Sequence, residues 1–208
     1  EEYKDGTRLI EILIETRAKG GAMLLNLGPK PDGTVPEPQE GRFREVALWH
    51  FANGEAIHDT RPWIVTNEGP IWFTRRRDED TVYAFITGES EWPRGQRRGF
   101  TLGSVSATEE TEVSVLGHGG VICEYMPTKD PTPCWSEDEA GLQLSIVRAQ
   151  RLYNNSRWPN PMVVKLTHVK SALQPPVVQT LDVTQAPQQF VGELTEMGDS
   201  ESLQLGFE

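Results

Sequence analysis

The chain has 208 residues, 37% of them hydrophobic, and this length is enough for one or two domains. Its formal net charge at pH 7 is −11, and a field of this sign repels phosphate backbones, which argues against nucleic acid as a partner. No apolar run is long enough to cross a bilayer as a helix, so the sequence predicts no membrane-spanning segment.

An amphipathic helix is predicted near the start of the chain. Residues 7–18 carry leucine and isoleucine at positions 9, 10, 13 and 14, which fall on one side of a helix. Asp5 or Thr7 precedes this stretch as a candidate N-cap, and Gly20 follows it as a stop signal. The pattern therefore predicts a surface helix with one buried face.

A strand, a loop and a second helix are predicted next. Residues 22–27 are mostly apolar, which is typical of a strand buried on both faces inside a parallel sheet. Residues 28–36 contain the glycines and prolines of a loop, and residues 37–52 show helical periodicity. No other strand–helix–strand unit appears in the chain. We therefore interpret residues 1–62 as a piece of a larger α/β structure whose remaining strands lie outside this sequence.

The periodicity changes after residue 63. Short runs rich in β-branched and aromatic residues replace the helical pattern up to about residue 170, and turn residues separate them. Seven such runs at this spacing predict an antiparallel β-sandwich. The predicted strands are Ile71–Thr74, Thr81–Thr87, Arg98–Leu102, Thr111–Leu116, Ile122–Met126, Leu142–Val147 and Met162–Thr167. Cys123 and Cys134 flank a proline-rich loop in this region, and both a disulfide and two free thiols remain open.

The two prolines at 175 and 176 mark a further boundary. Beyond them, three more strands are predicted over Val177–Val183, Phe190–Leu194 and Leu203–Phe207. The runs from Phe190 to Gly198 and from Leu205 to Glu208 resemble the opening strands of fibronectin type III-like modules. This resemblance implies a second β-module that the chain leaves unfinished.

A longer resemblance lies near the start. It comprises Gly20-Gly21-x-x-Leu24-Leu25-Asn26-x-Gly28-Pro29-x-x-Asp32-Gly33, the run from Trp49 to His58, and Thr60-Arg61-Pro62-Trp63. Together these resemble the end of the catalytic barrel of glycoside hydrolase family 29, the α-L-fucosidases. His58 stands where the family often has tyrosine. The resemblance implies that this stretch is the last barrel strand, its following helix and the exit into a β-sandwich.

The resemblance also implies a reaction. Members of the family hydrolyse terminal α-L-fucosyl linkages with retention, using an aspartate nucleophile and a glutamate acid/base. Both are expected upstream of the matching stretch, and neither can be placed on this chain. On the substrate side the family implies Asn26, Gly28 and Asp32, at the carboxyl end of a barrel strand. The alternative is structural: Asn26 satisfies backbone groups of the loop, and Gly28 and Asp32 serve its turns.

The sequence thus predicts a mixed fold in three parts. Residues 1–62 form a terminal helix–strand–helix piece of a (β/α)8-type barrel, 63–173 an antiparallel β-sandwich, and 174–208 a truncated fibronectin type III-like module. The expected parent is a bacterial α-L-fucosidase, periplasmic or extracellular, that acts on fucosylated glycans without a metal or organic cofactor; the chain alone is expected to be inactive. The alternative is a carbohydrate-binding or adhesion module of a non-catalytic parent.

Overall fold

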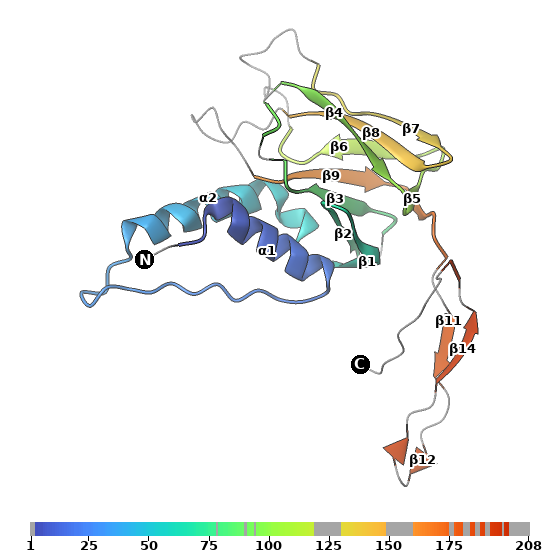
Figure 1. Cartoon of the computed structure of the whole chain (residues 1–208), viewed down its shortest axis with the longest axis horizontal. Helices are drawn as coiled ribbons and strands as arrows, with labels where there is room; N and C mark the ends of the chain where they lie inside the picture. The colour runs from blue at the N-terminus through green and yellow to red at the C-terminus, as the bar shows by residue number, and fades with distance from the viewer. Residues whose placement is uncertain are drawn as a thin grey trace.

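The computed structural model of the chain describes residues 3–77, 79–89, 91–93, 95–118, 130–148, 160–174, 177–180, 184–185, 188–189, 192–196 and 198–199. Two helices lie against a five-stranded antiparallel sheet, and a three-stranded sheet lies on its other side (Figure 1). The mixed helix and antiparallel-sheet content predicted from the sequence is confirmed at this level.

The two predicted helices are present. Helix α1 spans Gly6–Ala18, and Asp5 is its N-cap, since its Oδ1 accepts a 2.7 Å hydrogen bond from the Arg8 backbone N–H. Gly20 follows with φ of +83°, a left-handed conformation that ends the helix at low steric cost. Helix α2 spans Glu37–Asn53 and continues into a short 3-10 turn, η1, over Gly54–Ala56.

The larger sheet has the strand order β1-β2-β3-β9-β6, and every pair in it is antiparallel. These strands are β1 (Thr60–Glu68), β2 (Ile71–Arg76), β3 (Val82–Ile86), β9 (Met162–Thr167) and β6 (Glu112–Val115). The smaller sheet has the order β4-β8-β7, formed by β4 (Arg97–Leu102), β8 (Gly141–Val147) and β7 (Cys134–Asp138). A short pair, β5 (Val105–Ser106) with β10 (Lys170–Ser171), lies beside them.

Strand β3 is buried on both faces. Val82, Ala84 and Ile86 belong to a core that also contains Leu142 and Leu144 of β8, so this core lies between the two sheets. The intervening residues Tyr83 and Phe85 pack instead with the helices in a second core. That second core contains Ile10, Ile14, Trp49, Ala56, Ile57, Tyr83, Phe85, Leu116 and Val163.

Polar contacts fix the helices to the sheet. Asn160, which is buried just before β9, accepts a 2.8 Å hydrogen bond from Thr7 of α1 and donates a 3.1 Å bond to Glu45 of α2. Trp63 of β1 is half-buried against the core between the sheets, and its Nε1 donates a 3.1 Å bond to the Ser104 hydroxyl. The helices and both sheets therefore form one packed body.

The predicted strand at residues 22–27 is wrong for this chain. The segment between α1 and α2 is a long loop that pairs with no strand of the described structure (Figure 1). Leu24 is 88% exposed and Leu27 is 40% exposed. A strand requires a neighbour to satisfy its N–H and C=O groups, and the described residues supply none at this position. The apolar composition of the segment alone therefore does not form the strand.

Among the strands of the two sheets, β1 and β7 were not predicted from the sequence, and neither were the two-residue strands β5, β10, β12 (Thr184–Gln185) and β13 (Gln188–Gln189). Six predicted strands match β2, β3, β4, β6, β8 and β9, and the seventh, Ile122–Met126, lies outside the described residues, as does Cys123. Cys134 is exposed on β7. β1 begins at Thr60, so it crosses the predicted boundary between residues 62 and 63, and the division into three domains stays a prediction.

The tail contains two short antiparallel pairs. β11 (Val177–Thr180) pairs with β14 (Gly192–Glu196), and β12 (Thr184–Gln185) pairs with β13 (Gln188–Gln189). Figure 1 shows both pairs extending away from the two sheets. Phe190 and the predicted strand Leu203–Phe207 lie outside the described residues. The fibronectin type III-like module therefore stays a prediction.

Candidate functional site

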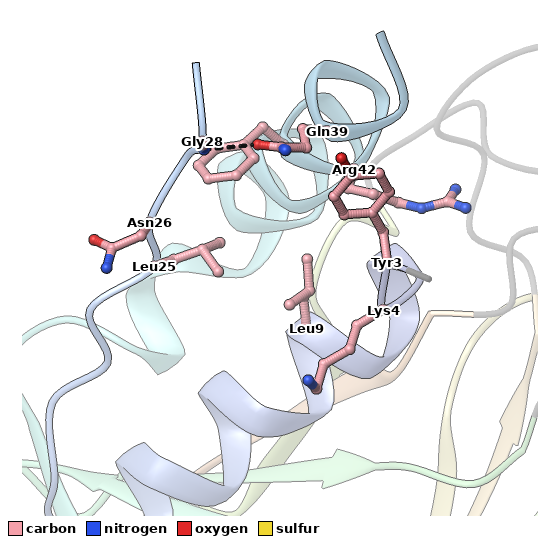
Figure 2. A pocket seen from close by; sticks show the side chains of 9 residues that line it. Tyr3, Lys4, Leu9, Leu25, Asn26, Gly28, Gln39 and Arg42 are labelled. Atoms are coloured by element: carbon pink, nitrogen blue, oxygen red, sulfur yellow. Dashed lines mark hydrogen bonds between the residues drawn. The ribbon is translucent and has the colours of Figure 1, made fainter. Parts of the chain in front are cut away.

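A pocket of about 280 Å³ opens between the two helices and the loop that joins them (Figure 2). Three parts of the chain contribute three residues each. The lining residues are Tyr3, Lys4 and Leu9 at the start of α1, Leu25, Asn26 and Gly28 in the loop, and Gln39, Arg42 and Phe43 on α2.

The loop is held against α2 at the edge of this pocket. The Gly28 backbone N–H donates a 2.9 Å hydrogen bond to Oε1 of Gln39. In Figure 2 the side chain of Leu25 points toward Leu9, which makes the inner wall apolar. The Asn26 amide points away from Leu9 and Tyr3, and Asn26 is exposed. Asn26 and Gly28 therefore lie at the pocket, but the Asn26 amide is directed to solvent.

Asp32 occupies a turn of the same loop and does not line the pocket. Its Oδ1 accepts hydrogen bonds from the Thr34 backbone N–H at 3.0 Å and from the Thr34 hydroxyl at 2.7 Å. These two bonds stabilise the carboxylate and lower the pKa of Asp32. Gly33, with φ of +83°, completes the turn. The three predicted site residues are thus not brought together, and their role toward a substrate stays a prediction.

The pocket can bind but offers no acid/base pair. None of the described lining residues is a carboxylate or a histidine, whereas Lys4 and Arg42 supply cationic groups and Tyr3 an aromatic ring. Glycoside hydrolysis with retention needs two carboxyl groups about 5–5.5 Å apart. Within the described part of the chain, no three His, Cys, Asp or Glu side chains are placed to hold a metal ion. None of the described helices is long and apolar enough to cross a membrane.

A polar cluster centred on Glu55 was not singled out from the sequence. Glu55 of η1 accepts a 2.9 Å hydrogen bond from Lys165 Nζ on β9 and a 3.2 Å bond from the Tyr83 hydroxyl on β3. Arg76 of β2 lies 4.0 Å from the same carboxylate. The Glu55 hydrogen bond raises the pKa of Lys165, and burial raises the pKa of Tyr83.

This Glu55 cluster attaches the end of α2 to three strands of the sheet. It contains a single carboxylate, so it cannot supply the pair that retention requires. The sequence signal was present, because Glu55 lies in the Trp49–His58 run, but its partners come from distant strands. Their convergence depends on sheet order, which one sequence does not reveal.

The chain is similar to known proteins of one family. A family model described as α-L-fucosidase matches residues 1–55. The plasma α-L-fucosidase of Rattus norvegicus is 36% identical over 123 residues, which cover 57% of this chain and 26% of the relative. The α-L-fucosidase of Branchiostoma floridae is 36% identical over 148 residues, covering 64% of this chain and 31% of the relative. The chain spans about a quarter to a third of the length of these curated relatives.

Solved structures share the fold. An α-L-fucosidase from Vibrio sp. strain EJY3 superposes with a TM-score of 0.57 at 19% identity, covering 81% of this chain and 27% of that one. The α-L-fucosidase isoenzyme 1 from Paenibacillus thiaminolyticus gives 0.55 at 20% identity, with 80% and 35% covered. The matches in both sequence and fold confirm the resemblance to the α-L-fucosidases of glycoside hydrolase family 29.

Proposed function

We propose that this chain is part of a retaining α-L-fucosidase that hydrolyses terminal α-L-fucosyl linkages of glycans and glycoconjugates. The observation that carries the proposal is the 36% identity over 148 residues to an α-L-fucosidase, which extends well beyond the stretch matched by the family model. A structural relative from Bacteroides thetaiotaomicron is titled as a trapped covalent intermediate, in complex with 2-fluoro-fucosyl fluoride. A covalent intermediate is the signature of retention.

In this proposal the pair of carboxylates comes from outside the chain. An aspartate would attack the anomeric carbon, and a glutamate would protonate the leaving oxygen and later activate water. Both would belong to sequence ahead of Glu1. The chain would contribute the last helix–strand–helix of the (β/α)8-type barrel, and its two sheets would form the β-sandwich that supports the barrel.

The exposed loop fits such a role. Residues 22–27 are mostly apolar, and Leu24 and Leu27 are exposed in this chain. Neighbouring barrel strands would supply hydrogen-bond partners and cover these side chains. Asn26, Gly28 and Asp32 would then lie at the carboxyl end of a strand, the side on which barrel enzymes bind substrate. We further propose a periplasmic or extracellular location, where fucosylated glycans are accessible.

The test compares two proteins on an aryl α-L-fucoside. The 208-residue chain should give no turnover above buffer, because it lacks both carboxylates. The full product of its gene should release the aglycone, and NMR of the first product should show the α-anomer of fucose. Turnover by the 208-residue chain that scales with protein concentration would overturn the assignment of catalysis to the missing part.

The alternative role as a carbohydrate-binding or adhesion module has a distinct outcome. In that case the full gene product would bind fucosylated glycan without cleaving it, and its sequence would lack the aspartate or the glutamate. Glycan binding and glycan hydrolysis are measured separately, so the two outcomes can be told apart.

A further inference from the structure

Two histidine rings meet at the end of helix α2. His50 lies in the last turn of α2, and His58 lies in the turn that leads into β1. Their Nε2 atoms are 2.6 Å apart. The ring centroids are 4.7 Å apart with an interplanar angle of 77°, so the rings meet edge to face. His58 is exposed, and His50 is half-buried.

The local backbone creates this meeting. The N–H groups of Ile57 and His58 both donate to the Gly54 carbonyl oxygen, at 3.0 and 2.9 Å, and the chain therefore turns back on the end of α2. A Cβ at Gly54 would lie 3.5 Å from Cδ2 of His50 and 3.7 Å from Cδ2 of His58. Both rings are thus held over one glycine.

The nearby charged side chains are engaged elsewhere. Glu55 bonds Lys165 at 2.9 Å, and Asp59 lies 3.9 Å from Arg77. Burial and the neighbouring His58 both lower the pKa of His50. The Nε2 atoms of these adjacent imidazoles are close enough to share a single proton. A divalent ion can take the place of this proton, because neutral imidazole nitrogen is its ligand.

We propose that His50 and His58 form a two-histidine binding site for a borderline transition-metal ion such as Zn²⁺ or Ni²⁺, which joins the end of α2 to the turn before β1. Water would fill the other coordination positions on the exposed His58 side. Zinc–nitrogen bonds of about 2.0–2.1 Å in a tetrahedral site place two ligand nitrogens about 3.3 Å apart. The distance between the two Nε2 atoms must therefore increase, by less than about 1 Å. Rotation of the exposed His58 ring can supply this change.

This site is separate from the pocket beside Asn26, because neither His50 nor His58 lines that pocket. It also depends on a feature of this sequence, His58, at a position where the family often has tyrosine. The proposal thus concerns this chain and not α-L-fucosidases as a class.

Calorimetric titration of the 208-residue chain with NiCl₂ and ZnCl₂ tests the proposal. We expect one ion to bind at about pH 7.5, and binding to be lost at about pH 5.5, where protons compete for the imidazoles. His50→Gln and His58→Gln should each weaken binding about tenfold or more, because each removes one of two ligands. EDTA should reverse the binding. Copper-induced NMR broadening should be centred on residues 50–58.

The matched control is His168→Asn, which removes an exposed histidine on another part of the surface. His168 has φ of +54°, a conformation that asparagine tolerates, so the fold should be retained. Melting curves without metal check that each variant is folded. If the unaltered chain binds no metal ion, the proposal is overturned and the two histidines form only a hydrogen bond. Uptake unchanged in the His50→Gln/His58→Gln double variant would place the ion elsewhere and overturn it equally.

Discussion

The indole Nε1 of Trp49 donates a 2.8 Å hydrogen bond to the backbone carbonyl oxygen of Pro161. Trp49 is fully buried in the core between α2 and the five-stranded sheet, and Pro161 immediately precedes β9. One side chain therefore combines apolar packing with a polar link between a helix and a strand that are 112 positions apart.

Substitution of Trp49 should separate these two contributions. Trp49→Phe leaves the Pro161 carbonyl without its donor and opens some volume, which should cost about 1–3 kcal/mol. Trp49→Ala also removes the packing and should cost about 3–5 kcal/mol of unfolding free energy. Urea denaturation of the 208-residue chain measures both. Phe51→Ala on the same helix is the control: Phe51 is 88% exposed, and its loss should change stability by less than about 0.5 kcal/mol.

Two glycines should respond in opposite directions to alanine. Gly141 at the start of β8 has φ of +118°, and a Cβ there would overlap the Leu102 carbonyl oxygen and lie 2.8 Å from Cα of Gly103. Gly141→Ala should therefore destabilise by more than about 2 kcal/mol. Gly41 lies inside α2 with open space around it, so Gly41→Ala should stabilise by about 0.5–1 kcal/mol. Equal melting temperatures for the two variants would contradict this account.

His118 should make stability depend on pH. Burial lowers its pKa from 6.5 to about 4, and neither ring nitrogen has a hydrogen-bond partner among the described residues. The unfolded chain binds this proton below pH 6.5, whereas the folded chain binds it only near pH 4. The unfolding free energy should thus fall as the pH drops through this window, by up to about 3 kcal/mol.

Comparison with His118→Phe isolates this effect from the carboxylates that titrate in the same range. The difference in unfolding free energy between the two proteins should change between pH 6.5 and 4 and be constant outside that window. A difference that does not vary with pH would show that His118 is solvated in the folded chain.

The Glu68 carboxylate should be important for the link between the two sheets. It accepts 2.7 and 2.8 Å hydrogen bonds from the backbone N–H groups of Gly103 and Ser104, beyond the end of β4. Glu68→Ala leaves both donors without this acceptor and should cost about 1–3 kcal/mol. Glu110→Ala is the matched control, because its side chain is 83% exposed and lies 4.0 Å from His168. Thermal unfolding should distinguish the two variants clearly.

The sequence predicted elements whose signals are local. Asp5 and Gly20 delimit α1 through cap chemistry that needs no distant partner. The strand predicted over Thr81–Thr87 matches β3, whose residues pack alternately into the two cores. These predictions succeeded because the residues themselves determine the conformation.

The elements that the sequence missed depend on partners. β7 is exposed at all five positions, so it shows no hydrophobic alternation, and it forms because β8 offers a free edge. β1 contains Pro62, which weakens the strand signal, yet it pairs with β2. Residues 22–27 show the opposite case: their composition predicts a strand, but no described strand lies beside them to pair with. The role of Asn26 toward a substrate stays a prediction, and the Glu55 cluster was not predicted from the sequence.

Because β3 is buried on both faces, a module boundary cannot be placed between the helices and the sheet without exposing one of these faces. A module that began at β1 would carry Tyr83 and Phe85 on a bare aromatic surface, because the side chains that cover them belong to α1 and α2. Such a surface favours aggregation over solubility. A fusion that uses this β-structure as an accessory domain should therefore include both helices and begin ahead of Gly6.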